Sequence, residues 1–232
     1  GGECLEILIQ WVVDHILVIL LTVGTIFNGI WLSKFQKQLK ITTPAILAIS
    51  VLHTVYGVFC VSVFAIIERF GDPSSVGNMS LFGGVFLMPV AYYAGAKLFR
   101  RDTGQVFDIF TICMLFTLMC ARTACLFSGC CAGMPIPGLN GACWPTRETE
   151  IVFYVVFLLF LGRKVLAGKT RGEVYPLYML AYGIFRFINE SFRISDSTTI
   201  FHVAHFWALI SACVGASIYF QMQTRRKKKV RR

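Results

Sequence analysis

The chain has 232 residues, of which 56% are hydrophobic, and its mean hydropathy is +0.68. This composition excludes an ordinary soluble domain and predicts an integral membrane protein. The net charge of +10 comes from short basic clusters between apolar runs, which argues against nucleic-acid binding. Since no repeat or low-complexity linker divides the chain, we expect one transmembrane domain over residues 1–232, with a basic tail at 223–232.

Seven apolar segments follow one another, each near the length of about 20 residues that a helix needs to cross a bilayer. They run over residues 9–33, 44–67, 81–99, 106–128, 149–163, 173–191 and 200–222. The sequence therefore predicts an all-α bundle of seven transmembrane helices. Pro89 is expected to kink the third helix and to open room beside Gly83 and Gly84.

Basic residues mark one side of the predicted membrane, after the first, third, fifth and seventh segments. The four clusters are Lys34, Lys37 and Lys40; Arg100 and Arg101; Arg163, Lys164, Lys169 and Arg171; and the tail TRRKKKVRR. Because loops rich in Lys and Arg stay in the cytoplasm, we expect the N-terminus outside and the C-terminus inside. The tail is interpreted as a topology anchor, with binding to anionic lipid as the alternative.

Two stretches carry charged groups where predicted helices end at the outer side. ARTACLFSGCCAG places Arg122 before a loop rich in Gly and Cys. YGIFRFINESFR spaces Arg186, Glu190 and Arg193 at i, i+4 and i+7, on one helix face. Charged groups at membrane depth face a protein interior or a wet cavity, and by default they mark a functional site.

The balance of charge in these stretches favours an anionic ligand. Three arginines against one carboxylate leave positive charge over, and arginine binds phosphate through two parallel hydrogen bonds. A phospholipid phosphate lies at this depth of the outer leaflet. The alternative is a structural ion pair between Arg186 and Glu190.

These stretches resemble the signatures of the prolipoprotein diacylglyceryl transferase family. YGIFRFINESFR resembles Tyr-Gly-x-x-Arg-x-x-x-Glu-x-x-Arg, and ARTACLFSGCCAG resembles Gly-Arg-x-x-Asn-Phe-x-Asn-Gly-Glu, with Arg122 on the signature arginine. Leu81–Gly84 stands where the family has His-Gly-Gly, and Cys143–Arg147 where it has His-Pro-Ser/Thr-Gln. The four landmarks follow the family's order over about residues 50–222, and they imply its seven-span fold.

The resemblance implies an enzyme that takes the diacylglyceryl group from phosphatidylglycerol, or another anionic phospholipid, at the outer face of the bacterial cytoplasmic membrane. The acceptor would be the cysteine thiol in the lipobox peptide of a lipoprotein precursor, and glycerol phosphate would leave. No cofactor and no metal are implied.

The resemblance also implies roles for individual residues. Arg122 and Arg186 would stabilise the charge of the leaving phosphate, and Glu190 would orient Arg186. Arg193 would hold the headgroup or close the site, and Tyr182 would donate a hydrogen bond to the phosphate. The other substrate-binding candidates come from the two glycine-containing landmarks: Gly83, Gly84, Cys125 and Gly129.

The chain departs from the family at residues that would handle the acceptor. Phe82 replaces the histidine, Cys125 replaces the asparagine and Cys130 stands at the glutamate. A thiol acceptor must lose its proton, and no evident base replaces the histidine. We therefore interpret the chain as a divergent member. The alternatives are a transferase or lyase with another acceptor, and a non-catalytic lipid-binding or transport protein.

Cysteines near the outer face allow three interpretations. Cys143 with Cys130 or Cys131 would form a disulfide in an oxidising exterior. Cys130 or Cys125 would instead be a reactive thiol beside Arg122, and Cys130 is then a catalytic candidate. The third interpretation is simple packing.

Two histidines at the outer start of the last segment also have several interpretations. His202 or His205 would replace the missing base, and His205 is the catalytic candidate. Together with outer-face cysteines they would complete a four-ligand metal set, although their spacing is not diagnostic. The plain interpretation is a pair of polar residues at the membrane interface.

Overall fold

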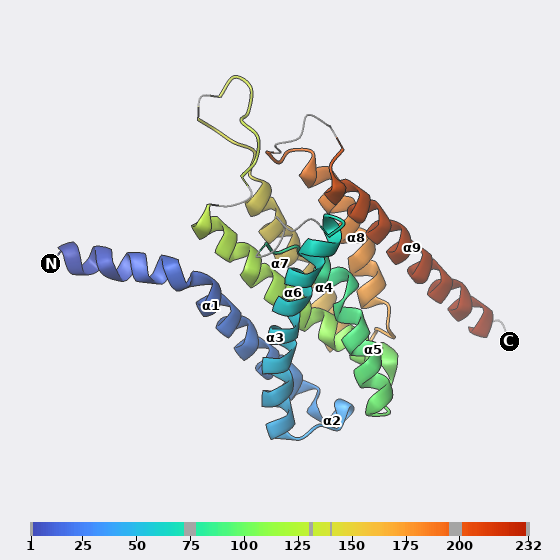
Figure 1. Ribbon diagram of the computed structural model, residues 1–232. Coiled ribbons are helices and arrows are strands. Elements are labelled where there is room, and N and C mark those ends of the chain that lie inside the picture. The colour runs from blue at the N-terminus through green and yellow to red at the C-terminus, as the bar shows by residue number, and fades with distance from the viewer. Residues whose placement is uncertain (1, 72–77, 130–131, 140, 195–200, 231–232) are drawn as a thin grey trace.

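The computed structural model describes residues 2–71, 78–129, 132–139, 141–194 and 201–230 (Figure 1). In these residues the chain forms helices and two isolated β-bridges, and no strand. The helices are α1 (Gly2–Lys34), α2 (Gln36–Leu39), α3 (Thr43–Glu68), α4 (Phe82–Phe86), α5 (Met88–Leu98), α6 (Thr103–Ser128), α7 (Thr146–Leu166), α8 (Val174–Glu190) and α9 (Val203–Val230). The predicted all-α class is confirmed.

Four helices of the described residues are long and apolar enough to cross a membrane. They are Gln10–Lys34, Thr43–Glu68, Thr103–Ser128 and Val203–Lys228, which correspond to the first, second, fourth and seventh predicted segments. The third predicted segment is divided between α4 and α5, and α8 has 17 residues. The number of seven spans therefore stays a prediction.

The division between α4 and α5 follows from Pro89. Proline has no backbone N–H, so the carbonyl of Val85, four residues earlier, loses its helical donor. The hydroxyl of Tyr175 in α8 donates to that carbonyl, and the hydroxyl of Tyr56 in α3 donates to the carbonyl of Leu87 at 3.3 Å. Tyr175 thus satisfies the carbonyl that Pro89 releases, while the Leu87 carbonyl accepts from the backbone N–H of Val90 as well as from Tyr56.

The break does not open space beside Gly83. A Cβ atom on Gly83 would lie 2.2 Å from the carbonyl oxygen of Cys60, because α4 packs directly on the backbone of α3. On Gly84, a Cβ atom would meet the side chain of Leu118 in α6 at 3.2 Å. In the structure these two glycines serve the close approach of α4 to its neighbours.

Two glycines allow α8 and α9 to cross at close range. A Cβ atom on Gly183 of α8 would lie 2.5 Å from the backbone nitrogen of Ala212, and one on Gly215 of α9 would lie 2.4 Å from that of Leu180. Small residues permit this backbone contact between helices in a membrane, where van der Waals packing drives association. The last helix is thereby fixed against the helix that carries Arg186.

The basic segments of the chain lie at one end of the bundle (Figure 1). The C-terminal ends of α6 and α8 lie at the opposite end. Three contacts join the basic segments: a hydrogen bond of 3.2 Å from Arg101 to the Lys40 carbonyl, backbone packing of Gly104 on Arg171, and an ion pair between Arg226 and Glu173. The helix α9 continues to Val230, so most of the basic stretch 223–232 is helical.

The contact between α8 and α9 predicts a measurable difference between two glycine substitutions. Gly183→Ala should lower stability by about 1–3 kcal/mol, since its Cβ atom would overpack the backbone of α9. Gly95→Ala is the control, because its Cβ atom would point into open space. We would measure unfolding of both variants in detergent. Equal unfolding midpoints for Gly183→Ala and Gly95→Ala would contradict the close backbone packing of α8 on α9.

Candidate functional site

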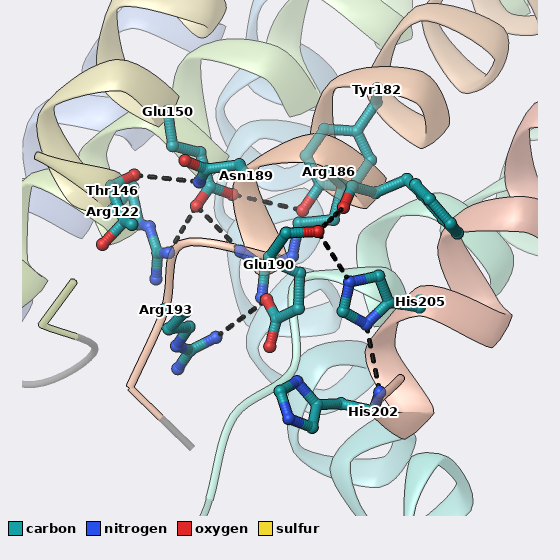
Figure 2. A network of polar contacts seen from close by, with 12 residues as sticks. Arg122, Thr146, Glu150, Tyr182, Arg186, Asn189, Glu190, Arg193, His202 and His205 are labelled. Carbon is teal, nitrogen blue, oxygen red and sulfur yellow. Dashed lines mark hydrogen bonds and ion pairs between the residues drawn. The ribbon is translucent and has the colours of Figure 1, made fainter. Parts of the chain in front are cut away.

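The predicted arginines meet at the end of the bundle opposite the basic segments (Figure 2). Arg122 comes from the last two turns of α6, Arg186 from the last turns of α8, and Arg193 from the segment just after α8. Arg122 and Arg186 are only 4% and 7% exposed, while the Arg193 side chain is 25% exposed at the rim. Two guanidinium groups are thus buried and a third lies nearer the surface.

Glu150, one turn into α7, brings the buried arginines together. Its side chain is fully buried, and its carboxylate pairs with Arg122 and with Nη1 of Arg186, the latter at 3.3 Å. It also accepts a hydrogen bond of 3.2 Å from the hydroxyl of Tyr182. Since two guanidinium groups repel each other, most strongly where water is excluded, the shared carboxylate is what allows them to lie side by side.

Glu190 extends this network toward the rim. Its Oε2 lies 2.7 Å from Nη2 of Arg186 and 3.6 Å from Nη1 of Arg193. The ion pair between Arg186 and Glu190, the alternative to an anionic ligand in the sequence analysis, is therefore present. The predicted ratio of three arginines to one carboxylate is wrong, because it omitted Glu150.

The five groups alternate in charge as Arg122, Glu150, Arg186, Glu190 and Arg193 (Figure 2). Three positive and two negative groups give this Arg–Glu network a formal charge of +1 (3 − 2). The excess is smaller than predicted but has the same sign. This count covers only the five ion-paired groups, whose one excess positive charge would favour a phosphate.

Neighbouring contacts fix the ends of α7 and α8 around the network. The amide of Asn189 donates to the Thr146 carbonyl at 3.0 Å, and the hydroxyl of Thr149 donates to the Asn189 side-chain oxygen at 3.1 Å. These bonds hold the first turn of α7 against the last turn of α8. The arginines and glutamates are therefore preorganised by bonds that do not involve charge.

The two stretches singled out in the sequence lie side by side. Gly133, in the loop after α6, forms an antiparallel bridge with Arg193. The backbone N–H of Met134 donates to the Phe192 carbonyl at 2.8 Å, and that of Ile194 to the Ala132 carbonyl at 3.1 Å. The rim of the site is thus built from the loop after α6 and the segment after α8.

The remaining predicted residues of these helices lie around the network. Tyr182 is fully buried and donates to Glu150, and the ring of Phe82 contacts it edge-on, with ring centroids 5.8 Å apart. Cys125 donates from its thiol to the Ala121 carbonyl at 3.6 Å. Gly129 ends α6 in the left-handed region, with φ of 70°, which glycine adopts without strain. The apolar ring of Phe82 thus lies next to Tyr182.

His205 lies next to the Glu190 end of the network and is 2% exposed (Figure 2). Its Nδ1 accepts a hydrogen bond of 3.1 Å from the backbone N–H of His202, and its Nε2 lies 3.2 Å from the hydroxyl oxygen of Ser191. A neutral ring that accepts at Nδ1 carries its proton on Nε2. In this arrangement His205 donates to Ser191.

Cys130 and Cys131 lie outside the described residues, and so does the predicted disulfide to Cys143. Within the part of the chain that the structure describes, His, Cys, Asp and Glu side chains form no group of three or more suited to a metal ion. The rings of His202 and His205 lie next to each other, with centroids 5.4 Å apart. The backbone N–H of His202 donates to Nδ1 of His205, so the spacing of three residues serves a local hydrogen bond.

Sequence reasoning missed two carboxylates near the network. Glu150 lies inside the predicted span 149–163, where an ionisable residue is itself a signal of function, but helical spacing links it to none of the arginines. Glu68, at the end of α3, lies where the charges of Arg186 and Arg193 act on its carboxylate. Glu150 and Glu68 come from helices other than those of the arginines, and spacing within one helix does not reveal such a relation.

The comparison with protein families agrees with this arrangement. The family described as prolipoprotein diacylglyceryl transferase matches residues 15–221, which include the whole Arg–Glu network. The chain belongs to this family. The chain is also similar to the phosphatidylglycerol–prolipoprotein diacylglyceryl transferase of Polaromonas naphthalenivorans (strain CJ2), with 29% identity over 133 residues. The alignment covers 52% of this chain and 49% of that relative, so the similarity spans about half of each.

The shared carboxylate predicts a large effect of a single truncation. Glu150→Ala should destabilise the fold by about 3–5 kcal/mol, because it leaves two buried guanidinium groups without their common partner. Glu148→Ala is the control: it lies two residues earlier, its side chain is 49% exposed, and its pair with Arg147 spans 3.9 Å. Unfolding in detergent would compare the two. Similar losses for both variants would show that Glu150 does not hold the site together.

Proposed function

We propose that this protein transfers the diacylglyceryl group of phosphatidylglycerol to a thiol, that of a lipoprotein precursor or a related acceptor. The observation that carries the proposal is the pair of buried guanidinium groups held on Glu150. Such a pair matches an anionic phosphate bidentately in a site from which water is largely excluded. Membership of the family and the activity named for the Polaromonas relative support the choice of substrate.

The proposed reaction is a displacement at carbon. The thiolate of the acceptor attacks the glycerol carbon that carries the phosphate, a carbon–sulfur bond forms, and the carbon–oxygen bond to phosphate breaks. The bonding electrons leave with the phosphate oxygen, so the products are a diacylglyceryl thioether and glycerol phosphate. The proton of the thiol goes to a base of the protein.

Negative charge grows on the phosphate as the carbon–oxygen bond breaks, and this is where the arginines act. Arg122 and Arg186 would stabilise that charge, and removing one such donor costs about 10²–10³ in rate in other enzymes. Glu150, Glu190 and Tyr182 would position the guanidinium groups. Arg193, partly exposed at the rim, would hold the headgroup.

The acceptor side of the site is proposed from residues next to the network. His205 and Glu68 are the two candidates for the base that takes the thiol proton. His205 would first exchange its bond from His202 or its bond to Ser191, since each ring nitrogen is engaged. The predicted catalytic role of Cys130 and the substrate-binding roles of Gly83, Gly84, Cys125 and Gly129 remain proposals.

We also infer that the chain crosses the bacterial cytoplasmic membrane seven times, with the N-terminus outside. The joined basic segments at one end of the bundle support this orientation, because they would face the cytoplasm. The Arg–Glu network at the other end would then lie toward the outer leaflet. Phosphatidylglycerol of that leaflet and the lipobox peptide would reach the site from the outer side.

Phe82 favours a second candidate function, a lipid-binding protein without catalysis. Its apolar ring is 2% exposed and lies against Tyr182, where the family has a histidine. Such a protein would keep the phosphate site but not the reaction.

The direct test incubates the purified protein with labelled phosphatidylglycerol and a lipobox peptide, followed by mass spectrometry of both. We expect the thioether and glycerol phosphate together. Arg122→Gln and Arg186→Lys should each lower turnover by roughly 10²-fold or more. Arg163→Gln, an exposed arginine at the other end of α7, is the control and should leave turnover unchanged.

Two other results would revise the proposal. Glycerol phosphate without modified peptide would indicate a different acceptor. Intact phosphatidylglycerol that copurifies with the protein and is lost in Arg122→Gln would favour the lipid-binding alternative.

The identity of the base predicts a difference in pH profile. If His205 accepts the proton, His205→Gln should lower turnover by roughly 10²-fold and abolish the fall in activity that protonation of His205 causes toward low pH. In that case Glu68→Gln should keep the pH profile of the wild type. If the profile is unchanged in His205→Gln but lost in Glu68→Gln, the base is Glu68.

A further inference from the structure

A cavity lies away from the Arg–Glu network, at the end of the bundle that carries the basic segments. It has a volume of about 560 Å³, within the usual range for ligand pockets. It is lined by residues of α3 and α5, by the segment at the end of α2 and by Val106 and Phe110 of α6. Figure 1 shows where these helices lie. We call this cavity the α3–α5 groove.

The wall of the α3–α5 groove is almost entirely apolar. Its long sides include Ile49 and Leu52 of α3, Met88 of α5, and Phe110 of α6, and His53 lies at its deep end. Leu52 and Phe99 are each 64% exposed, so the groove opens sideways onto the surface that faces lipid. This shape suits a hydrocarbon chain that enters from the bilayer.

Two cations lie at the end of the groove nearest the basic loops. Lys40 ends α2, and Arg101 precedes α6. The guanidinium of Arg101 donates from one Nη to the Lys40 carbonyl at 3.2 Å, and its Nε is buried without a hydrogen-bond partner among the described residues. The described lining contains no carboxylate, and the neighbouring Asp102 uses its side chain to cap α6 at the N–H of Gln105.

We propose that the α3–α5 groove binds an anionic phospholipid of the leaflet opposite to the Arg–Glu network. One acyl chain would lie along the apolar wall, and the phosphate would bind the N–H groups of Arg101 and the ammonium of Lys40. A phosphate is the partner that two neighbouring cations at the polar end of an apolar groove complement. The site differs from the catalytic one in its helices and its membrane side, and it does not depend on transferase activity.

The groove geometry allows three matched variants. Arg101→Gln removes the proposed phosphate ligand. Gly95→Leu fills the groove, because a Cβ atom on Gly95 meets no atom within 4 Å. Arg100→Gln is the control, since it makes the same change in charge one residue away, on an exposed residue outside the groove lining.

The experiment uses the full chain in phosphatidylcholine nanodiscs that contain phosphatidylglycerol with a photoactivatable acyl chain. After illumination, mass spectrometry quantifies cross-linked peptides of α3 and α5 and, separately, those of α8. We expect α3 and α5 cross-links in the wild type, and about tenfold fewer in Arg101→Gln and Gly95→Leu. Arg100→Gln should match the wild type, and the same label on phosphatidylcholine should give few α3 and α5 cross-links.

Equal cross-linking of α3 and α5 in the wild type and all variants would overturn the proposal. A loss of cross-links in Arg100→Gln as large as that in Arg101→Gln would also overturn it, because lipid would then respond only to the positive charge of the surface. Thermal unfolding of each variant controls for folding. Cross-links to α8 report on lipid bound at the Arg–Glu network. If α8 cross-links are absent while those to α3 and α5 are present, the result counts against the proposed function and not against lipid binding in the groove.

Discussion

The structure depends on one buried carboxylate shared by two arginines. Arg122 in α6 and Arg186 in α8 cannot approach each other at membrane depth unless a negative group lies between them, and Glu150 of α7 is that group. Burying each charge costs several kcal/mol, which only pairing and hydrogen bonding offset. The ends of three helices are therefore tied to one position, and a phosphate would meet two guanidinium groups already aligned.

The rest of the bundle can be understood as support for that arrangement. Gly183 and Gly215 let α9 lie directly on α8, and so fix the helix that carries Arg186 and Glu190. The break at Pro89 lets α4 pack on α3, while Tyr175 of α8 satisfies the carbonyl that the break releases. Close backbone contacts at Gly183 and Gly215 therefore help to set the position of α8.

Sequence patterns predicted the helical class and singled out the two stretches that the structure brings together. Apolar runs indicated helices, and Pro89 indicated the irregularity between α4 and α5. Helical spacing placed Arg186, Glu190 and Arg193 on one helix face, but α8 ends at Glu190, so Arg193 pairs with Glu190 from the segment after the helix. Glu150 was missed because spacing relates residues within one helix and carries no information about facing helices. The room expected beside Gly83 was wrong for the same reason, since the backbone of α3 fills it.

The most direct test of the shared-carboxylate site is a double-mutant cycle on phosphatidylglycerol affinity with Arg122→Gln, Arg186→Gln and the double variant. If both arginines bind one phosphate, their effects should couple, and the double variant should differ from the sum of the single losses by about 0.5–3 kcal/mol. Additive losses within about 0.5 kcal/mol would mean that the two arginines act independently, and would contradict a single site organised by Glu150.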